Sequence, residues 1–476
     1  MTRVGCWALS SAASPSSVAI SVASILLLSV NLVFIAISIV WCISHPPRWR
    51  AEFRRCAVDI RQDVVERFLR YVKIDTQSKD GVEDRYPSTE KQLVLSRMLV
   101  EELKAIGLDD AELDKHGYVM ASLPAHVPEG VKAAAKMPTV GLLAHVDTYH
   151  EVSGKDVKPI LHDDYAGGPI VLPKVESPIS PDDNPELALY KGSTIITSDG
   201  STLLGGDDKA GVAEIMTLMA LFKSDPSLAH PKIRVGFTPD EEVGRGTEHF
   251  DVKKFGADVA YTLDGSGMGE VEDETFCADS AFVTIKGIDV HPGYAKGKMV
   301  NAVRLAMDFI SRLRKDALPE TTEGYEAYLH PYQISGSVTE ARITLLVRAF
   351  TEEDLAKMAA ELERIKAEVL EAEPRTTIDI EVKESYRNMK QVLDNHPAVV
   401  EYAEEAWRRV DVEPKRLAIR GGTDGARLSF EGLPTPNLSA GGYNFHSTHE
   451  WVAVKAMVKA VEAVRALMGI YVEKGL

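Results

Sequence analysis

The stretch 232-KIRVGFTPDEEVGRG-246 decides the fold, because an apolar segment passes directly into charged residues. Residues 232–237 predict a buried strand, and Asp240, Glu241 and Glu242 follow it as consecutive carboxylates. Adjacent anions repel one another, so they stabilise no fold by themselves. The stretch therefore predicts a strand that ends in a group of carboxylates able to bind a positively charged partner.

The segments on both sides of this stretch predict how the sheet is built. Residues 209–224 are typical of a helix that begins just after Asp207 and Asp208. Residues 139–147 and 259–264 predict two more buried strands, each ending in polar residues. Strand, helix and strand in this order favour an α/β domain with a largely parallel or mixed sheet covered on both faces.

Two helices are predicted ahead of the first strand. Residues 63–74 form one, and residues 88–106 form the other. Ser88 or Thr89 is the expected N-cap of the second helix, and Gly107 lies just past its end.

The pattern changes after about Asp279, where alternating, half-exposed strands replace the buried ones. Their order with two intervening helices, β-α-β-β-α-β, predicts a ferredoxin-like α+β satellite domain that interrupts the catalytic domain. The predicted parts are an N-terminal segment (1–55), a catalytic domain in two pieces (56–278 and 388–476) and the satellite domain (279–387).

Composition narrows the class of protein. The chain has 476 residues, 45% of them hydrophobic and 26% charged, which is typical of a globular protein with more than one domain. Its net charge of -17 argues against nucleic acid as a partner, because phosphate binding needs a basic surface. Only Cys277 lies clearly inside the globular part, so we expect a reducing compartment and no disulfide framework.

The N-terminal segment is long and apolar enough to span a bilayer as a helix. Arginines at 48, 50, 54 and 55 follow it and would keep the rest of the chain in the cytoplasm. Membrane association thus depends on this segment, and the alternative is an upstream start-site error ahead of a soluble protein. On either interpretation we expect a cytoplasmic location.

Polar residues gather where the predicted strands end, the edge at which open α/β sheets bind ligands. Taken singly, a His-x-Asp pair, an acidic pair before a helix or a Glu-Glu turn usually has a structural role. Together they supply the imidazole and carboxylate donors that zinc, cobalt or manganese prefers, and one carboxylate can bridge two ions. The residues are His145, Asp147, Asp207, Asp208, Glu241, Glu242, Asp264 and His446.

The same segments resemble the peptidase T branch of a co-catalytic zinc peptidase superfamily that also holds carboxypeptidase G and aminoacylase. The likeness runs from "VERFLRYVKIDTQS" to the last helix. It is carried by "HVDT", "LLGGDDKAGVAEIM", "FTPDEEVGRG", "YTLDG", "VHPGYAKGKMVNA", "IRGGTDGA" and "NFHSTHE".

The resemblance implies two Zn²⁺ ions per chain, with Co²⁺ or Mn²⁺ as alternatives. His145, Asp207 and Asp264 would hold one ion. Asp207, Glu242 and His446 would hold the other, with Asp207 as the bridge. Asp147 would orient His145, and Glu241 would act as the general base.

The resemblance also implies three substrate-binding residues. His291 would reach the reaction centre when domains close or subunits pair, Arg348 would bind a substrate carboxylate, and Arg420 would line the cleft. Without the resemblance, the three residues are typical of a turn histidine, a surface arginine and an arginine beside tight turns.

Some residues depart from the branch. "HVDTYHE" stands where "HMDTSPD" is usual, so Tyr149 and His150 alter the rim of the site. Cys277 stands in place of an asparagine and would remove a polar contact near the substrate. Ala349 removes a charge beside Arg348. We expect these departures to affect substrate preference rather than hydrolysis.

The predicted activity is removal of the first residue from tripeptides, with a homodimer possible. A dipeptidase, a carboxypeptidase or an N-acyl amino acid deacylase would use the same chemistry. A metal-binding protein without turnover is the alternative from another class, and the presence of Glu241 argues against it.

Overall fold

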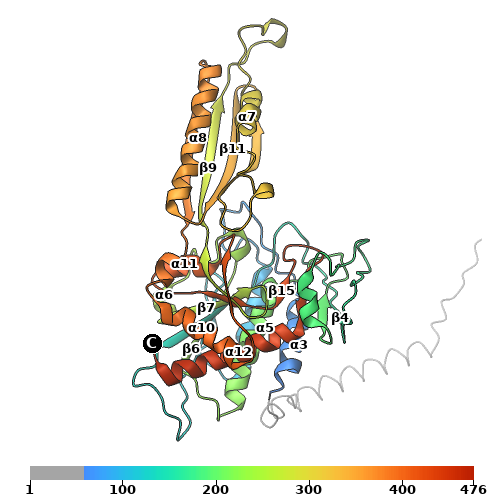
Figure 1. Cartoon of the computed structure of the whole chain (residues 1–476), viewed down its shortest axis with the longest axis vertical. Coiled ribbons are helices and arrows are strands. Elements are labelled where there is room, and N and C mark those ends of the chain that lie inside the picture. The colour runs from blue at the N-terminus through green and yellow to red at the C-terminus, as the bar shows by residue number, and fades with distance from the viewer. Residues whose placement is uncertain (1–57) are drawn as a thin grey trace, which may run out of the picture. The chain divides into compact units, whose positions relative to one another are not determined.

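The computed structural model describes residues 58–476, which group as one compact unit (Figure 1). The predicted N-terminal segment (1–55) lies outside the described residues. Within residues 58–476, every helix is too short or too polar to cross a membrane.

An eight-stranded mixed sheet forms the centre of the catalytic domain, in the order β1-β2-β6-β3-β7-β14-β8-β13. β3 pairs in parallel with both β6 and β7, whereas β2 pairs with β6 antiparallel. The predicted mixed sheet is therefore confirmed. The strands are β1 (Glu112–Leu113), β2 (Val119–Leu123), β3 (Thr139–His145), β6 (Lys232–Thr238), β7 (Val259–Gly265), β8 (Glu270–Thr275), β13 (Lys415–Ile419) and β14 (Asn437–Ser439).

A hydrophobic core covers each face of this sheet. Successive side chains of a strand point to opposite faces, so neighbouring residues enter different cores. In β3, Leu142 packs into the large core and Leu143 into a smaller one on the other face. The large core takes in α3 (Ile60–Tyr71), α4 (Gln92–Ile106), α5 (Gly206–Ser224), α10 (Pro397–Arg409) and α12 (Val454–Lys474). The smaller core takes in α6 (Val252–Phe255) and α11 (Asp424–Phe430).

The satellite domain has the predicted β-α-β-β-α-β order and a ferredoxin-like antiparallel sheet, β10-β11-β9-β12. Two helices share one face of this sheet with a common core (Figure 1). The boundaries at 279 and 387 stay predictions. The elements are β9 (Cys277–Lys286), α7 (Ala302–Ser311), β10 (Tyr328–Gly336), β11 (Glu340–Ala349), α8 (Glu352–Ala372) and β12 (Thr377–Tyr386).

Two of the departures noted above lie in the core of the satellite domain. Cys277 and Ala349 are both fully buried there, opposite each other on β9 and β11. The Cys277 side chain therefore packs inside the domain, and its effect on substrate binding stays a prediction.

A second antiparallel sheet, β15-β16-β5-β4, lies in the catalytic domain. Its strands are β4 (Ile160–His162), β5 (Ile195–Thr197), β15 (Gly442–Tyr443) and β16 (Trp451–Ala453). The expectation that Asp207 directly follows a strand is wrong, because residues 198–205 form a loop between β5 and α5. Asp207 therefore reaches the sheet edge from the start of a helix.

Candidate metal centre

Five predicted side chains meet at the carboxyl ends of β3, β6 and β7. Nε2 of His145 lies 2.8 Å from Oδ1 of Asp207 and 3.4 Å from Oδ1 of Asp264. Nε2 of His446 lies 3.1 Å from Oδ2 of Asp207 and 2.9 Å from Oε2 of Glu242. Two groups of donors result, each spanning at most 4.8 Å, and Asp207 belongs to both.

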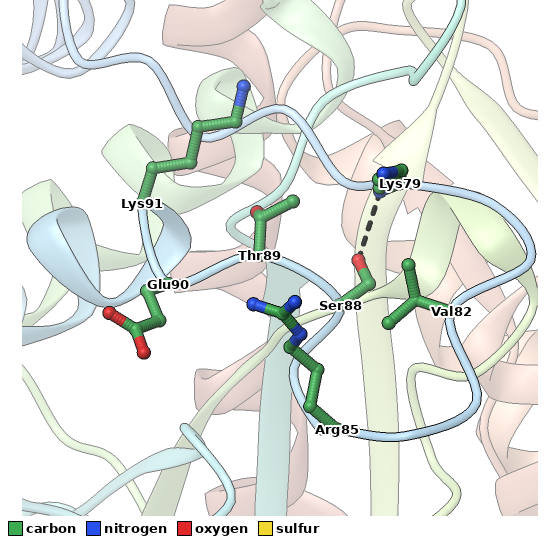
Figure 2. Close-up of a pocket in the computed structure, with 7 residues that line it drawn as sticks. All are labelled: Lys79, Val82, Arg85, Ser88, Thr89, Glu90 and Lys91. Atoms are coloured by element: carbon green, nitrogen blue, oxygen red, sulfur yellow. Dashed lines mark hydrogen bonds between the residues drawn. The ribbon is translucent and has the colours of Figure 1, made fainter.

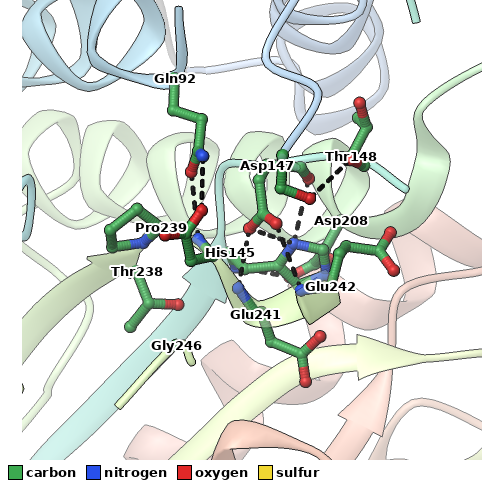
Figure 3. Close-up of polar contacts among 12 residues, drawn as sticks. Gln92, His145, Asp147, Thr148, Asp208, Thr238, Pro239, Glu241, Glu242 and Gly246 are labelled. Carbon is green, nitrogen blue, oxygen red and sulfur yellow. Dashed lines mark hydrogen bonds and ion pairs between the residues drawn. The ribbon is translucent and has the colours of Figure 1, made fainter. Parts of the chain in front are cut away.

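Asp147 lies between His145 and the turn that carries Glu241 and Glu242 (Figure 3). Its side chain is fully buried, and Oδ1 lies 3.4 Å from Nδ1 of His145. The same carboxylate accepts hydrogen bonds from the backbone N–H groups of Glu241 (3.1 Å) and Glu242 (3.2 Å). Asp147 thereby fixes both the His145 ring and the turn that carries Glu241 and Glu242.

The carboxylate of Glu241 points away from Asp147 (Figure 3). Within residues 58–476, no hydrogen-bond donor reaches this carboxylate, and Glu241 belongs to neither group of metal donors. Glu241 is therefore free to exchange a proton with a molecule bound beside the centre.

The third member of the acidic run has a different role. Asp240 has a positive φ of 59° and turns its buried carboxylate toward the start of α4. The side-chain amide of Gln92 (2.6 Å) and the backbone N–H of Ser88, which precedes the helix, donate to it. Ser88 is thus not the predicted N-cap, since α4 begins after Lys91 and the Ser88 hydroxyl also donates to Asp240. Neutral donors, rather than a metal ion, satisfy Asp240.

A surface pocket of about 450 Å³ lies beside this contact (Figure 2). Lys79, Val82, Arg85 and residues 88–91 line it, and no predicted metal ligand is among them. In the pocket wall the backbone N–H of Lys79 donates to the Ser88 hydroxyl at 3.0 Å (Figure 2). The pocket therefore lies on the Ser88 side of this contact, apart from the predicted metal ligands.

Sequence reasoning missed Glu450, which holds the loop that presents Asp207. Its buried carboxylate accepts from the backbone N–H groups of Leu204 (2.7 Å), Gly205 (2.8 Å) and Asp207 (3.1 Å). Glu450 ends the "HSTHE" motif that also contains His446, so a carboxylate close to a predicted ligand was the available signal.

Two further buried carboxylates support the centre. Asp208 accepts from the backbone N–H of His145 (3.1 Å) and from that of Gly211 (3.1 Å), so it ties β3 to the start of α5. Asp424, also missed, accepts from the hydroxyl of Thr238 at 2.7 Å. Both acids therefore hold the ends of strands that carry predicted ligands.

Burial dominates the electrostatics of the centre. It raises the pKa of Glu242 to about 8, with the charge of Asp207 adding to the effect, and that of Asp264 to about 6. Burial also raises the pKa of Glu241 well above its ordinary value. Burial lowers the pKa of His446, yet hydrogen bonds to Asp207 and Glu242 outweigh it and raise the pKa to about 11. Burial disfavours the charged form of these carboxylates, and a bound cation would favour it.

The donor set fits divalent metal ions. Two imidazoles and three carboxylates are typical ligands of zinc and of neighbouring transition metals. One oxygen of Glu242, Oε1, is buried and has no hydrogen-bond partner among the described residues. A buried carboxylate oxygen in that position is expected to coordinate an ion.

Of the three predicted substrate-binding residues, Arg348 and Arg420 both lie beside Tyr328, whereas His291 lies in a separate turn. Arg348 is the last residue but one of β11, and its Nη1 donates to the carbonyls of Asp279 and Val347, both at 3.0 Å. His291 is exposed in a turn of the satellite domain, and its Nδ1 accepts from the backbone N–H of Gly293. The structure thus does not bring His291 to the metal centre.

Arg420 links β13 to the satellite domain. Its guanidinium donates to the carbonyls of Gly324 (2.6 Å) and Glu326 (3.1 Å). The same group lies 5.2 Å from the ring centre of Phe276 and 5.6 Å from that of Tyr328. These contacts fix Arg420 at the joint between the two domains.

Known proteins are similar to this chain in sequence and in fold. The model of Peptidase family M20/M25/M40 matches residues 200–469. Peptidase T of Geobacillus kaustophilus is 48% identical over 416 residues, covering 87% of this chain and 100% of that protein.

Two solved structures have the same fold. A tripeptidase from Staphylococcus aureus superposes with a TM-score of 0.67 at 22% identity, over 87% of this chain and 98% of that one. A dinuclear metal-binding M20 peptidase from Bacillus subtilis superposes with a TM-score of 0.57 at 14% identity, over 88% of this chain and 100% of that one. The predicted fold class is therefore confirmed.

Proposed function

The chain belongs to the peptidase T group of Peptidase family M20/M25/M40, and we propose that the centre around Asp207 carries its metal-dependent aminopeptidase activity on tripeptides. The observation that supports this most strongly is one carboxylate shared by two groups of metal donors, with an unpaired glutamate beside them. A metal-binding protein without turnover would need no such glutamate.

The residues that would hold the two ions follow from the two groups of donors. His145, Asp207 and Asp264 would hold one, and Asp207, Glu242 and His446 the other. Imidazole and carboxylate donors favour zinc, and cobalt or manganese would also fit. When bound, such a pair of ions polarises the scissile carbonyl and lowers the pKa of a water molecule to about 7.

Glu241 would move the proton during hydrolysis. Its carboxylate takes a proton from the attacking water and then gives it to the leaving amine. Burial raises the pKa of Glu241, which favours the protonated form needed for the second transfer. Asp147 keeps the backbone of this turn in place, so Glu241 can change its protonation state without losing its position.

Arg348 is the residue that we expect to bind the C-terminal carboxylate of the peptide. Its Cζ lies 5.9 Å from the ring centre of Tyr386. Burial raises the pKa of Tyr386 to about 12, and the charges of both Arg348 and Glu241 also act on it. Tyr386 thus lies within electrostatic reach of the proposed base and of the proposed carboxylate-binding residue.

The activity is tested on the full chain, loaded with Zn²⁺. Release of free amino acid is followed from a tripeptide, the dipeptide derived from it and the N-acetylated tripeptide, each with and without a chelator. We expect chelator-sensitive cleavage of the tripeptide alone, because an aminopeptidase needs a free amine. Cleavage of the acetylated peptide instead would indicate a deacylase or carboxypeptidase, and cleavage of the dipeptide would indicate a dipeptidase.

The role of Arg348 needs its own matched control. Arg348→Ala should raise KM for the tripeptide but leave KM for the corresponding tripeptide amide unchanged, because the amide has no carboxylate. An equal rise for both substrates would remove the carboxylate assignment.

A further inference from the structure

Tyr149 lies flat against His446, one of the proposed metal ligands. The two rings are 4.0 Å apart between their centres and differ in plane by only 3°. Tyr149 belongs to the loop after β3, whereas His446 follows β15, so residues far apart in the chain form this stack. Planar stacking at this distance is a favourable aromatic contact.

The loop that carries Tyr149 is firmly held. The side-chain amide of Gln77 donates to the carbonyls of His150 and Val152, both at 2.9 Å. The backbone N–H of Ser78 donates to the carbonyl of Thr148 at 3.1 Å. The Tyr149 hydroxyl itself donates to Glu151 at 3.0 Å. Hydrogen bonds therefore hold both the backbone of this loop and the Tyr149 hydroxyl.

His446 has few other supports. Its side chain is 43% exposed, whereas that of His145 is 2% exposed. Its backbone has a positive φ of 61°, a conformation that side chains other than glycine rarely adopt. Among the described residues, Nδ1 of His446 has no hydrogen-bond partner, while Nδ1 of His145 contacts Asp147. Besides its two carboxylate neighbours, Tyr149 is what limits the orientation of the ring.

We infer that Tyr149 is a positioning residue for His446, and that its ring fixes the imidazole for binding of one metal ion. The inference rests on the proposed function, because it takes His446 as a ligand. Stacking here replaces the hydrogen bond that usually orients a metal-binding histidine.

The test measures metal affinity, not turnover. Zn²⁺ is titrated calorimetrically into the metal-free full chain, with a competing chelator of known affinity, for the wild type, Tyr149→Ser, Tyr149→Leu and Tyr149→Phe. Tyr149→Ser and Tyr149→Leu should weaken one of the two sites by roughly two- to tenfold, the value of one aromatic pair. Tyr149→Phe keeps the ring and should bind both ions with wild-type affinity.

A double-variant cycle assigns the affected site. In the His446→Ala background, Tyr149→Ser should have no effect on the ion that still binds. The inference is overturned if Tyr149→Ser binds both ions normally, if Tyr149→Phe is as weak as Tyr149→Ser, or if the effect persists without His446. A wild type that binds fewer than two ions, or does not cleave tripeptide, would instead contradict the proposed function.

Discussion

The two nitrogen donors of the centre, His145 and His446, are held in opposite ways. His145 ends a central strand, is 2% exposed and has Asp147 beneath its second nitrogen. His446 lies in a turn after a short strand, is 43% exposed and rests against Tyr149. The centre therefore has an inner half, with His145 and Asp264, and an outer half, with His446 and Glu242, joined by Asp207.

The difference between the two histidines shows how one site can hold some metal ligands in a fixed orientation and still leave room for a peptide to approach. Hydrogen bonds and burial fix the inner half, because an unsatisfied polar group there would cost free energy. The outer half borders solvent through His446 alone, because Glu242 is buried, so a peptide can approach on the side of His446. The orientation of this histidine then depends on packing. The inner half has its histidine at the end of a central strand, and the outer half has its histidine in an exposed turn. Asp207 belongs to both halves.

Removal of either histidine tests this contrast most strongly. His145→Ala and His446→Ala should each lose one ion per chain and with it nearly all hydrolysis. In the metal-free protein, His145→Ala should lower the free energy of unfolding by roughly 3 kcal/mol, because one partner of a buried ion pair is lost. His446→Ala should lower it by about 1 kcal/mol or less, as for exposed pairs.

Metal content by elemental analysis and unfolding in urea measure both effects. Equal losses of stability in the two variants would show that the inner and outer halves do not differ. Unchanged metal content would remove that histidine from the set of ligands.

Glu241 and Glu242 are neighbours in one turn, and we expect different roles for them, a base and a metal ligand. Glu241→Gln should keep both ions yet lose kcat by on the order of a hundredfold or more, because an amide cannot accept the proton. Glu242→Gln is the matched control and should lose the outer ion. Near wild-type turnover of Glu241→Gln would exclude it as the base.

Glu450 joins the two halves, because it holds the loop of the shared ligand. Glu450→Gln keeps the shape of the side chain, but its amide nitrogen cannot accept a backbone N–H. The affinity for both ions should fall by roughly ten- to a hundredfold, as for other groups that orient a metal ligand. Competition titration with Zn²⁺ measures this, and a loss confined to one ion would contradict a shared role for Asp207.

The ends of strands made much of this site predictable from the sequence. His145, Glu242 and Asp264 come just after apolar runs that could only be buried strands, so their approach to one another followed from the sheet. The satellite domain was predictable for a similar reason, since alternating strands and two helices in that order allow few topologies.

Other parts depend on contacts that no local pattern records. Glu450 binds a loop 246 residues earlier in the chain, and nothing in its neighbourhood identifies that partner. Asp240 has the same charge as its neighbours, yet a positive φ turns it toward Ser88 and Gln92. The stack of Tyr149 on His446 joins two loops, whose paths depend on the whole fold.

The smallest expected effect is the difference in affinity between the two ions, which sets the order in which a chelator removes them. The outer ion borders solvent through His446, so a chelator should remove it first, with an affinity about tenfold below that of the inner ion. Chelator titration of the Co²⁺-loaded full chain, followed by absorbance, should therefore show two steps. His446→Ala should lack the first step and keep the second. A single step in the wild type would mean that Asp207 couples the two ions so strongly that the inner and outer halves lose metal as one unit.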